Sequence, residues 1–181
     1  MRELLVVLLG SLLVLASCRN EVKLTADAVE DRASLPGLDA SQVTTLISDS
    51  GITRYRITTP TWQIYDKATP VYWEFPDGIY LEKFNPDFEV NTWLCSDYAY
   101  YDEQAQLWEL RGNVRSMNAD SEFFETPQLF WNQKTERIYS DSTISITREA
   151  SIIKGIGFQS NQELTKYTIL NPTGVFPIKD E

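Results

Sequence analysis

Apolar and polar residues alternate along the chain from Gly51 onward, in short runs that turn residues interrupt. In such a run every second side chain lies on the same face, which is typical of a β-strand buried on one side. The breaks come at Pro, Gly, Asn and Asp, at intervals of roughly eight to twelve residues, as in sandwiches and open barrels. Residues 30–47 have room for one helical turn and no more. The pattern therefore predicts an all-β fold.

The first four strands follow from the runs and from the turn residues between them. Pro60 is expected to end the first strand, and Pro76-Asp77-Gly78 and Asn85-Pro86-Asp87 are expected to form turns. Proline fixes φ, while glycine and asparagine accept the positive φ that many turns require. The predicted strands are Ile52–Thr58, Thr61–Tyr65, Val71–Phe75 and Ile79–Phe84.

A weak internal repeat supports this interpretation. Residues 99–116, AYYDEQAQLWELRGNVRS, align with residues 129–146, LFWNQKTERIYSDSTISI. No aligned position is identical, but most pairs keep their chemical character, such as Tyr101 with Trp131. Each unit is predicted to be a strand, a polar turn and a second strand, with the turns at DEQAQ and NQKTE.

The alternation also predicts which side chains face inward. In WELRGNV, Trp108, Leu110 and Val114 share one face, while Glu109 and Arg111 share the other. The inner face is either a closed core or the wall of an apolar groove, and composition does not decide between the two. The candidate groove residues are Tyr55, Ile57, Trp62, Ile64, Trp73, Phe75, Ile79, Leu81, Trp108, Leu110, Val114, Ile144 and Ile146.

The N-terminus has the architecture of an export signal. Arg2 precedes the apolar run LLVVLLGSLLVLA, which is shorter than the roughly 20 residues that span a bilayer. Ala16 and Ser17 before Cys18 form the pattern of a bacterial lipobox, so we expect a lipid on Cys18; an ordinary secreted protein is the alternative. The expected organisation is a signal peptide at 1–17, a polar tether at 18–47 and one folded domain at 48–181.

Composition excludes several classes of function. The formal net charge is −10 and no basic cluster occurs, which argues against a nucleic-acid partner. The sequence has no histidine, which excludes Ser-His-Asp and Cys-His catalysis and histidine-based zinc sites. A lipidated Cys18 leaves Cys95 as a lone thiol, which we interpret as a small buried residue, with a reactive or intermolecular thiol as the alternative.

Candidates for catalysis are few. Asp102 and Glu103 are two carboxylates, as glycoside hydrolysis requires, but neighbours on a turn point apart and are solvated. GIGFQS, from Gly155, lacks the third glycine of a dinucleotide fingerprint and the following helix, so a bulge or strand corner explains it better. The acidic residues lack the spacing of a calcium loop. We expect no enzyme, no cofactor and no metal site.

Six stretches between about Ser48 and Phe176 carry a resemblance to a known family. In order they are SDSGITRYRITTPTWQIYD, YWEFPDGIYLEKF, DYAYYDEQAQLWELRGNV, TPQLFWNQKTERIYSDSTISI, IIKGIGFQSNQELTKYTI and NPTGVF. Each alone is weak, but their order and spacing are specific. Together they resemble the LptC family, the periplasmic component of the lipopolysaccharide-export ABC transporter, which is related to the OstA-like domains.

The resemblance implies an open, folded-over antiparallel β-jellyroll whose concave apolar interior receives the acyl chains of lipopolysaccharide. It also implies two sheet edges that bind partners. The N-terminal edge, carried over to Ile52–Thr58, would face the membrane subunits of the transporter. The C-terminal edge, carried over to residues 166–176, would pair with an LptA-like jellyroll of the periplasmic bridge. ATP hydrolysis in the partner subunits would drive the lipid.

The chain departs from the family pattern at its start. Many members are held by a transmembrane helix, whereas this chain is expected to use the lipid on Cys18; two or three acyl chains anchor a protein stably. The expected location is the periplasmic face of the inner membrane of a Gram-negative bacterium. The outer membrane is the alternative, because Arg19 after Cys18 is not a retention signal in bacteria that sort by this residue.

Two other classes of function stay open. One is a carbohydrate-binding surface lipoprotein, because β-sandwiches with exposed aromatic residues bind sugars. The other is a cell-wall or glycan hydrolase, which the lack of histidine and of a convincing acid pair disfavours. The resemblance favours a lipid-binding component that receives lipopolysaccharide from the transporter and passes it along the bridge.

Overall fold

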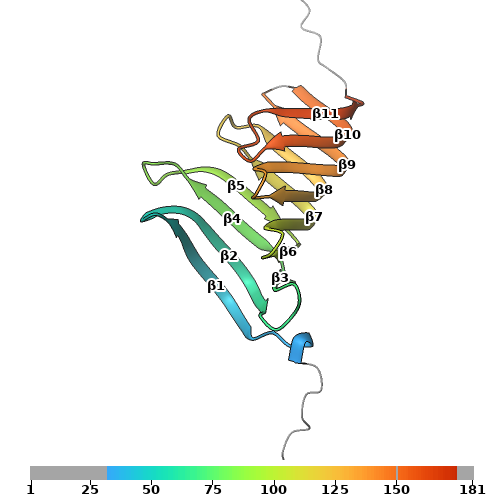
Figure 1. Cartoon of the computed structure of the whole chain (residues 1–181). Helices are drawn as coiled ribbons and strands as arrows, with labels where there is room; N and C mark the ends of the chain where they lie inside the picture. Colours follow the sequence, from blue (N-terminus) through green and yellow to red (C-terminus); the bar gives the residue numbers. More distant parts are fainter. Residues whose placement is uncertain (1–31, 150, 175–181) are drawn as a thin grey trace, which may run out of the picture. The chain divides into compact units, whose positions relative to one another are not determined.

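The computed structural model describes residues 32–149 and 151–174, which belong to one compact unit. The predicted signal peptide and Cys18 lie outside the described residues. In the described residues, eleven antiparallel strands form one continuous sheet, and a short 3-10 helix, Arg32–Ser34, precedes it (Figure 1). The all-β prediction is confirmed, and the architecture is that of a β-jellyroll.

The strands differ in length, and the difference organises the fold. Five of them, β1, β2, β7, β9 and β10, have eleven or more residues, and most of the others are short. The strands are β1 (Leu38–Asp49), β2 (Ile52–Tyr65), β3 (Tyr72–Phe75), β4 (Ile79–Phe84), β5 (Val90–Ser96), β6 (Tyr98–Asp102), β7 (Leu107–Met117), β8 (Phe123–Asn132), β9 (Arg137–Arg148), β10 (Ser151–Asn161) and β11 (Tyr167–Pro172).

Strands β2, β7, β8, β9 and β10 each belong to two walls of the sheet. One half of β2 pairs with β3 and the other half with β4; one half of β7 pairs with β6 and the other half with β5. The pairings β7–β8, β8–β9 and β9–β10 change register near the middle of the strands. We call the wall with β3 and β6 the first wall and the wall with β4 and β5 the second wall.

The two walls face each other. Tyr55 on β2 and Trp131 on β8 are separated by three strands in the sheet order. In a flat sheet four strand spacings put them about 19 Å apart. Their ring centroids are only 6.1 Å apart. The sheet must therefore fold over, with Tyr55 on the second wall and Trp131 on the first.

Where the chain passes between the walls, buried hydroxyl groups stabilise the bend. Thr59, Ser96 and Thr126 each donate a hydrogen bond to the carbonyl oxygen two residues later, at 2.8, 2.9 and 2.9 Å. A bend removes carbonyl groups from regular strand pairing, and a buried carbonyl without a donor is costly. The hydroxyls of these three residues supply the missing donors.

Glycine is required at two positions close to where the chain bends or turns. Gly78 and Gly157 have φ of +92° and +81°, which favours glycine. A Cβ on Gly78 would lie 2.6 Å from the carbonyl oxygen of Ser96. Gly157 lies at the register shift between β10 and β9, so the bulge predicted in GIGFQS is present. Gly112 and Asn113 form a similar bulge inside β7, which therefore runs without interruption through WELRGNV.

The start of the fold differs from the sequence expectation. Residues 38–47, which were assigned to the tether, belong to β1, which pairs with β2 along nearly its whole length. Polar, exposed side chains cover most of β1, and the strand is held by backbone pairing instead of a buried face. A pattern of alternating burial cannot reveal such a strand.

The prediction that Pro60 ends a strand is wrong. Strand β2 continues through Pro60 to Tyr65. Pro60 lies opposite Gln42 of β1, which has φ of +54°, and neither residue takes part in the pairing of β1 with β2. Pro60 also lies between the segments of β2 that pair with β4 and with β3. A proline is tolerated there because its missing N–H is not needed for pairing.

The internal repeat is confirmed. The two units correspond to β6–β7 and β8–β9, and each has a four-residue turn. Asp102 Oδ1 accepts the Ala105 N–H at 2.7 Å, and Asn132 Oδ1 accepts the Thr135 N–H at 3.0 Å. The two turns also have a positive φ at equivalent positions. Asp102 thus has the structural role that its position predicted.

Candidate functional site

The space between the walls holds most of the residues predicted to face inward. Eight of them are buried in one hydrophobic cluster: Ile57, Phe75, Ile79, Trp108, Leu110, Val114, Ile144 and Ile146. Trp62, Trp73 and Leu81 are partly buried and pack against that cluster. Tyr55 and Ile64 are partly buried outside it; Tyr55 contacts Trp131, and Ile64 pairs with Trp73. The predicted inward orientation therefore agrees with the structure for the eleven residues in or against the cluster.

Aromatic side chains form a continuous row along the first wall. Successive ring contacts run from Trp62 to Phe75 at 5.7 Å, from Phe75 to Trp108 at 5.6 Å and from Trp108 to Trp131 at 6.4 Å. Trp73 and Tyr101 pack beside these rings. The residues come from β2, β3, β6, β7 and β8, so the row crosses the strands and runs along the length of the interior. We call these six residues the aromatic row.

The interior is narrow in this structure. A cavity of about 40 Å³ lies between the walls, where Tyr55 meets Trp131. This volume is comparable with the roughly 30 Å³ that one water molecule occupies in the liquid. The cavity is lined by Tyr55, Leu81, Lys83, Thr92, Leu94, Ser116, Trp131, Ile138, Gln162 and Leu164. An acyl chain can enter here only if the two walls separate.

Sequence reasoning missed several residues of this interior. The alternation did not identify Trp131, because QLFW has aromatic residues on both faces and parity alone does not show which of them faces inward. In the structure Trp131 faces the interior, whereas Phe130 stacks on Tyr139. The repeat contained a signal, since Trp131 aligns with Tyr101, another member of the aromatic row. The other missed residues are Leu94, Ala99, Tyr101, Phe124, Leu129, Ile138, Phe158 and Leu164.

The turn between β10 and β11, residues 162–166, contacts the second wall from across the interior. Lys83 Nζ and Glu163 Oε1 form an ion pair at 3.2 Å. The Leu164 carbonyl oxygen accepts a hydrogen bond from Asn118 Nδ2 at 2.9 Å. The Leu164 side chain is only 1% exposed and lines the cavity. We call this turn the clasp, because it joins the two walls at the C-terminal part of the jellyroll.

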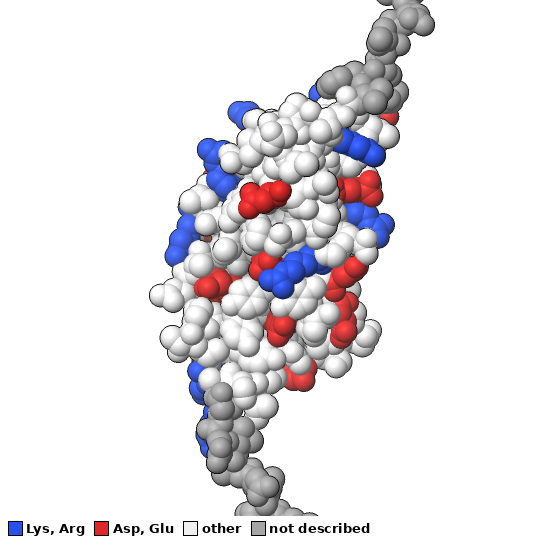
Figure 2. Space-filling view, turned by 90° about the vertical axis from the view of Figure 1, so that its right-hand side faces the viewer, with Lys and Arg blue, Asp and Glu red and all other residues white. Residues whose placement is uncertain are grey.

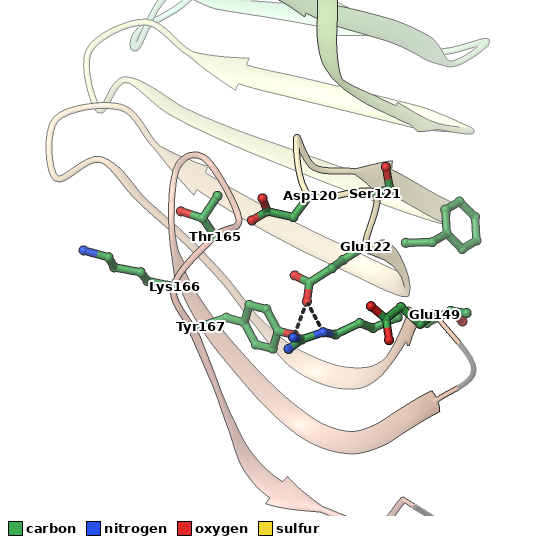
Figure 3. Close-up of a pocket in the computed structure, with 10 residues that line it drawn as sticks. Asp120, Ser121, Glu122, Glu149, Thr165, Lys166 and Tyr167 are labelled. Carbon is green, nitrogen blue, oxygen red and sulfur yellow. Dashed lines mark hydrogen bonds and ion pairs between the residues drawn. The ribbon is translucent and has the colours of Figure 1, made fainter. Parts of the chain in front are cut away.

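A polar hollow lies beside the clasp, around Glu122 (Figure 3). The Glu122 carboxylate is nearly buried and accepts hydrogen bonds from Asn118 Nδ2 and from the Tyr167 hydroxyl, and it pairs with Arg148. Burial, and secondly the charge of Glu122, raise the pKa of Tyr167 above its ordinary value. Tyr167 therefore remains a neutral hydroxyl donor at physiological pH and links β11 to Glu122.

The remaining polar groups offer little chemistry. Burial raises the pKa of the Cys95 thiol, which is free and partly buried, so the thiol stays protonated and is a poor nucleophile at neutral pH. Within the described residues, no group of three or more Cys, Asp or Glu side chains is placed to hold a metal ion. The main feature of the described residues is thus the apolar interior between the walls.

The outer surface carries both signs of charge. Figure 2 shows Lys and Arg interspersed with Asp and Glu on one face of the molecule. On the outer side of the first wall, Glu109 accepts hydrogen bonds from Arg111 at 2.7 Å and from Gln128 at 2.8 Å. The hydrogen bond from Arg111, which is the larger effect, and that from Gln128 lower the pKa of Glu109. Glu109 and Arg111 thus face outward, as parity predicted.

The sheet has two terminal strands, β1 and β11, which are labelled at its opposite ends in Figure 1. Strand β1 pairs only with β2, and β11 pairs only with β10, so each leaves one edge without a strand partner among the described residues. The N-terminal edge assigned to Ile52–Thr58 is therefore wrong: β2 is covered by β1 on that side. The C-terminal assignment overlaps β11. No helix among the described residues is long and apolar enough to cross a membrane.

These features define a class of protein: a folded-over β-jellyroll with an apolar, aromatic-lined interior. The profile of the family described as "Lipopolysaccharide-assembly, LptC-related" matches residues 4–174. The chain belongs to the LptC family. Membership implies a role in lipopolysaccharide transport. The family consists of periplasm-facing transport components and is not a family of enzymes. No curated protein matches the chain.

The clasp generates a testable prediction. Replacing Leu164 by alanine is expected to lower the free energy of unfolding by about 2–5 kcal/mol and to enlarge the cavity. Apolar cavities of this kind bind benzene, which stabilises the folded state by mass action. Benzene should therefore raise the melting temperature of Leu164→Ala in thermal unfolding.

The matched control is Leu170→Ala on β11, since Leu170 is 52% exposed. This variant should lose less than about 1 kcal/mol and should not respond to benzene. An equal response of both variants, or of neither, would contradict the assignment of Leu164 to the cavity between the walls.

Proposed function

We propose that this protein is a lipid-binding component of the lipopolysaccharide export machinery. It receives lipopolysaccharide from the inner-membrane ABC transporter and passes it along a bridge of β-jellyrolls. Two observations support the proposal: membership of the LptC family, and the aromatic row that runs along the interior from Trp62 to Trp131. The second is the observation that carries the argument on physical grounds.

An apolar interior addresses the main cost of moving a lipid through water. Each exposed methylene costs about 0.8 kcal/mol, so a dozen of them cost about 10 kcal/mol. An interior lined by aromatic and aliphatic side chains removes most of this cost. The protein itself makes and breaks no bonds in this scheme, and the work comes from ATP hydrolysis in its partners.

Lipid binding requires the walls to separate at Tyr55 and Trp131. Their contact is between side chains, at 6.1 Å between ring centroids, and the walls are joined covalently at the corners of the long strands. Separation therefore leaves the strand pairing within each wall intact. Acyl chains then contact the side chains that met across the interior, such as Tyr55 and Trp131, and the apolar surface of the interior stays out of water.

Contact between the interior and lipid can be tested by crosslinking. A photo-crosslinking amino acid at position 131 should capture lipopolysaccharide in cells, because Trp131 lines the cavity between the walls. Position 130 is the matched control: Phe130 is the neighbouring aromatic residue on β8, and its ring stacks on Tyr139 on the opposite face. Capture from position 130 and not from 131, detected by lipopolysaccharide immunoblot, would refute the interior path.

The two terminal strands are proposed as docking edges. Strand β1 would face the membrane subunits of the transporter, and β11 would pair with an LptA-like jellyroll. Both edges offer backbone groups for strand addition, in which main-chain hydrogen bonds supply affinity. Exposed apolar residues accompany each edge, with Leu46 53% exposed on β1 and Leu170 52% exposed on β11.

This assignment predicts different partners for the two edges. A photo-crosslinker at Leu46 should capture a transporter subunit, and one at Thr168 on β11 should capture another jellyroll, as identified by mass spectrometry of the adducts. The same adducts from both positions would contradict the polarity of the proposed path. Crosslinking from Arg111, on the outer side of the first wall, serves as the background level.

Cys18 is proposed to carry the lipid anchor that holds the protein at the periplasmic face of the inner membrane. Replacing Cys18 by alanine should move the protein from the membrane to the soluble fraction and abolish the mass added by the acyl chains. Cys95→Ala should change neither, because Cys95 lies within the fold. A Cys18→Ala protein that keeps the mass added by the acyl chains would rule out this anchor.

A further inference from the structure

Three indole N–H groups inside the molecule lack a hydrogen-bond partner. They belong to Trp62, Trp108 and Trp131, and none of the described residues accepts a hydrogen bond from these buried nitrogens. Trp108 is only 5% exposed as a whole residue. A buried donor without an acceptor is costly, and native proteins contain few of them. Three in one aromatic row therefore call for an explanation.

For Trp108, the neighbouring rings do not replace the missing acceptor. Trp108 contacts Phe75, Tyr101 and Trp131, with interplanar angles of 25°, 30° and 18°. An indole N–H lies in the plane of its own ring, so in these nearly parallel pairs it points along the neighbouring faces and not into them. The Trp108 donor is thus left without an acceptor by its three ring neighbours.

The three donors are spaced along the proposed lipid path. Trp62 is on β2, Trp108 on β7 and Trp131 on β8, so they follow the aromatic row across the strands of the first wall. Trp131 also lines the cavity between the walls. An apolar wall with isolated donors suits a ligand that is mostly hydrocarbon and carries a few oxygen acceptors.

We propose that the indole N–H groups of Trp62, Trp108 and Trp131 bind the oxygen atoms of acyl chains, that is, ester or amide carbonyls and chain hydroxyls. The interior then distinguishes oxygen-bearing acyl chains from plain alkyl chains. This inference rests on the proposed function and names the ligand chemistry of the same site. Each donor satisfied by such an oxygen regains the hydrogen bond that it lacks without the ligand.

Two matched lipids test this inference. One is 1-myristoyl-lysophosphatidylcholine, whose chain is joined through an ester; the other is its 1-O-tetradecyl analogue, with the same headgroup and an ether in place of the ester. Only the ester carries a carbonyl oxygen, which is the stronger acceptor. The probes are added to the full chain, below their critical micelle concentrations, and the indole N–H signals of the ¹⁵N-labelled protein are followed by NMR.

The expected result is a downfield shift of the Trp62, Trp108 or Trp131 signal with the ester lipid and not with the ether lipid. The ester lipid should also bind about fivefold more tightly, which is the effect of one ordinary hydrogen bond. Trp108→Phe keeps an aromatic ring but removes the donor. If its signal is among those that shift, this variant should lose about fivefold of the ester preference.

Trp73→Phe is the matched control, because Trp73 belongs to the aromatic row but its nitrogen is not among the buried atoms without a partner. It should leave the ester preference unchanged. Equal binding of both lipids, with the same shifts of the indole signals, would overturn the inference and leave the proposed acyl-binding interior standing. If neither lipid perturbs the interior signals, both fall.

Discussion

The bend in the middle of the long strands is the constraint on which the rest of the structure depends. It places one half of β2 and β7 in each wall, so side chains four strand spacings apart meet across the interior, as Tyr55 and Trp131 do. Buried hydroxyls at Thr59 and Thr126 and a glycine at position 157 make the bend tolerable. Without the bend these strands would form a flat sheet with one wet face, and no enclosed path would exist.

The same bend would let one molecule combine a stable fold with the opening of the interior that the proposed function requires. Backbone pairing holds each wall together, and the walls meet mainly through side chains and the clasp. Rings such as Trp108 and Phe75 are buried on one wall, so they remain packed on their neighbours when the walls separate. The residues that stabilise the fold and the residues that would contact lipid are therefore largely the same.

The terminal strands complete this arrangement. A sheet that leaves β1 and β11 without outer partners presents unpaired backbone groups at both ends of its interior. Exposed edges are normally an aggregation risk. Under the proposed function, the two edges would instead align one apolar interior with the next. The apolar interior and the free edges are thus two consequences of one open, folded sheet.

The sequence by itself determined the all-β class, the repeat and the inner faces, because alternation is a local property of a strand: Trp108, Leu110 and Val114 were placed by parity alone. It did not determine β1, whose polar residues bury no face, nor the course of β2 through Pro60. Trp131 was missed because QLFW is aromatic on both sides. Only the tertiary structure decided which distant strands face each other, because the fold-over brings together residues that have no local relation, such as Tyr55 and Trp131 or Asn118 and Leu164.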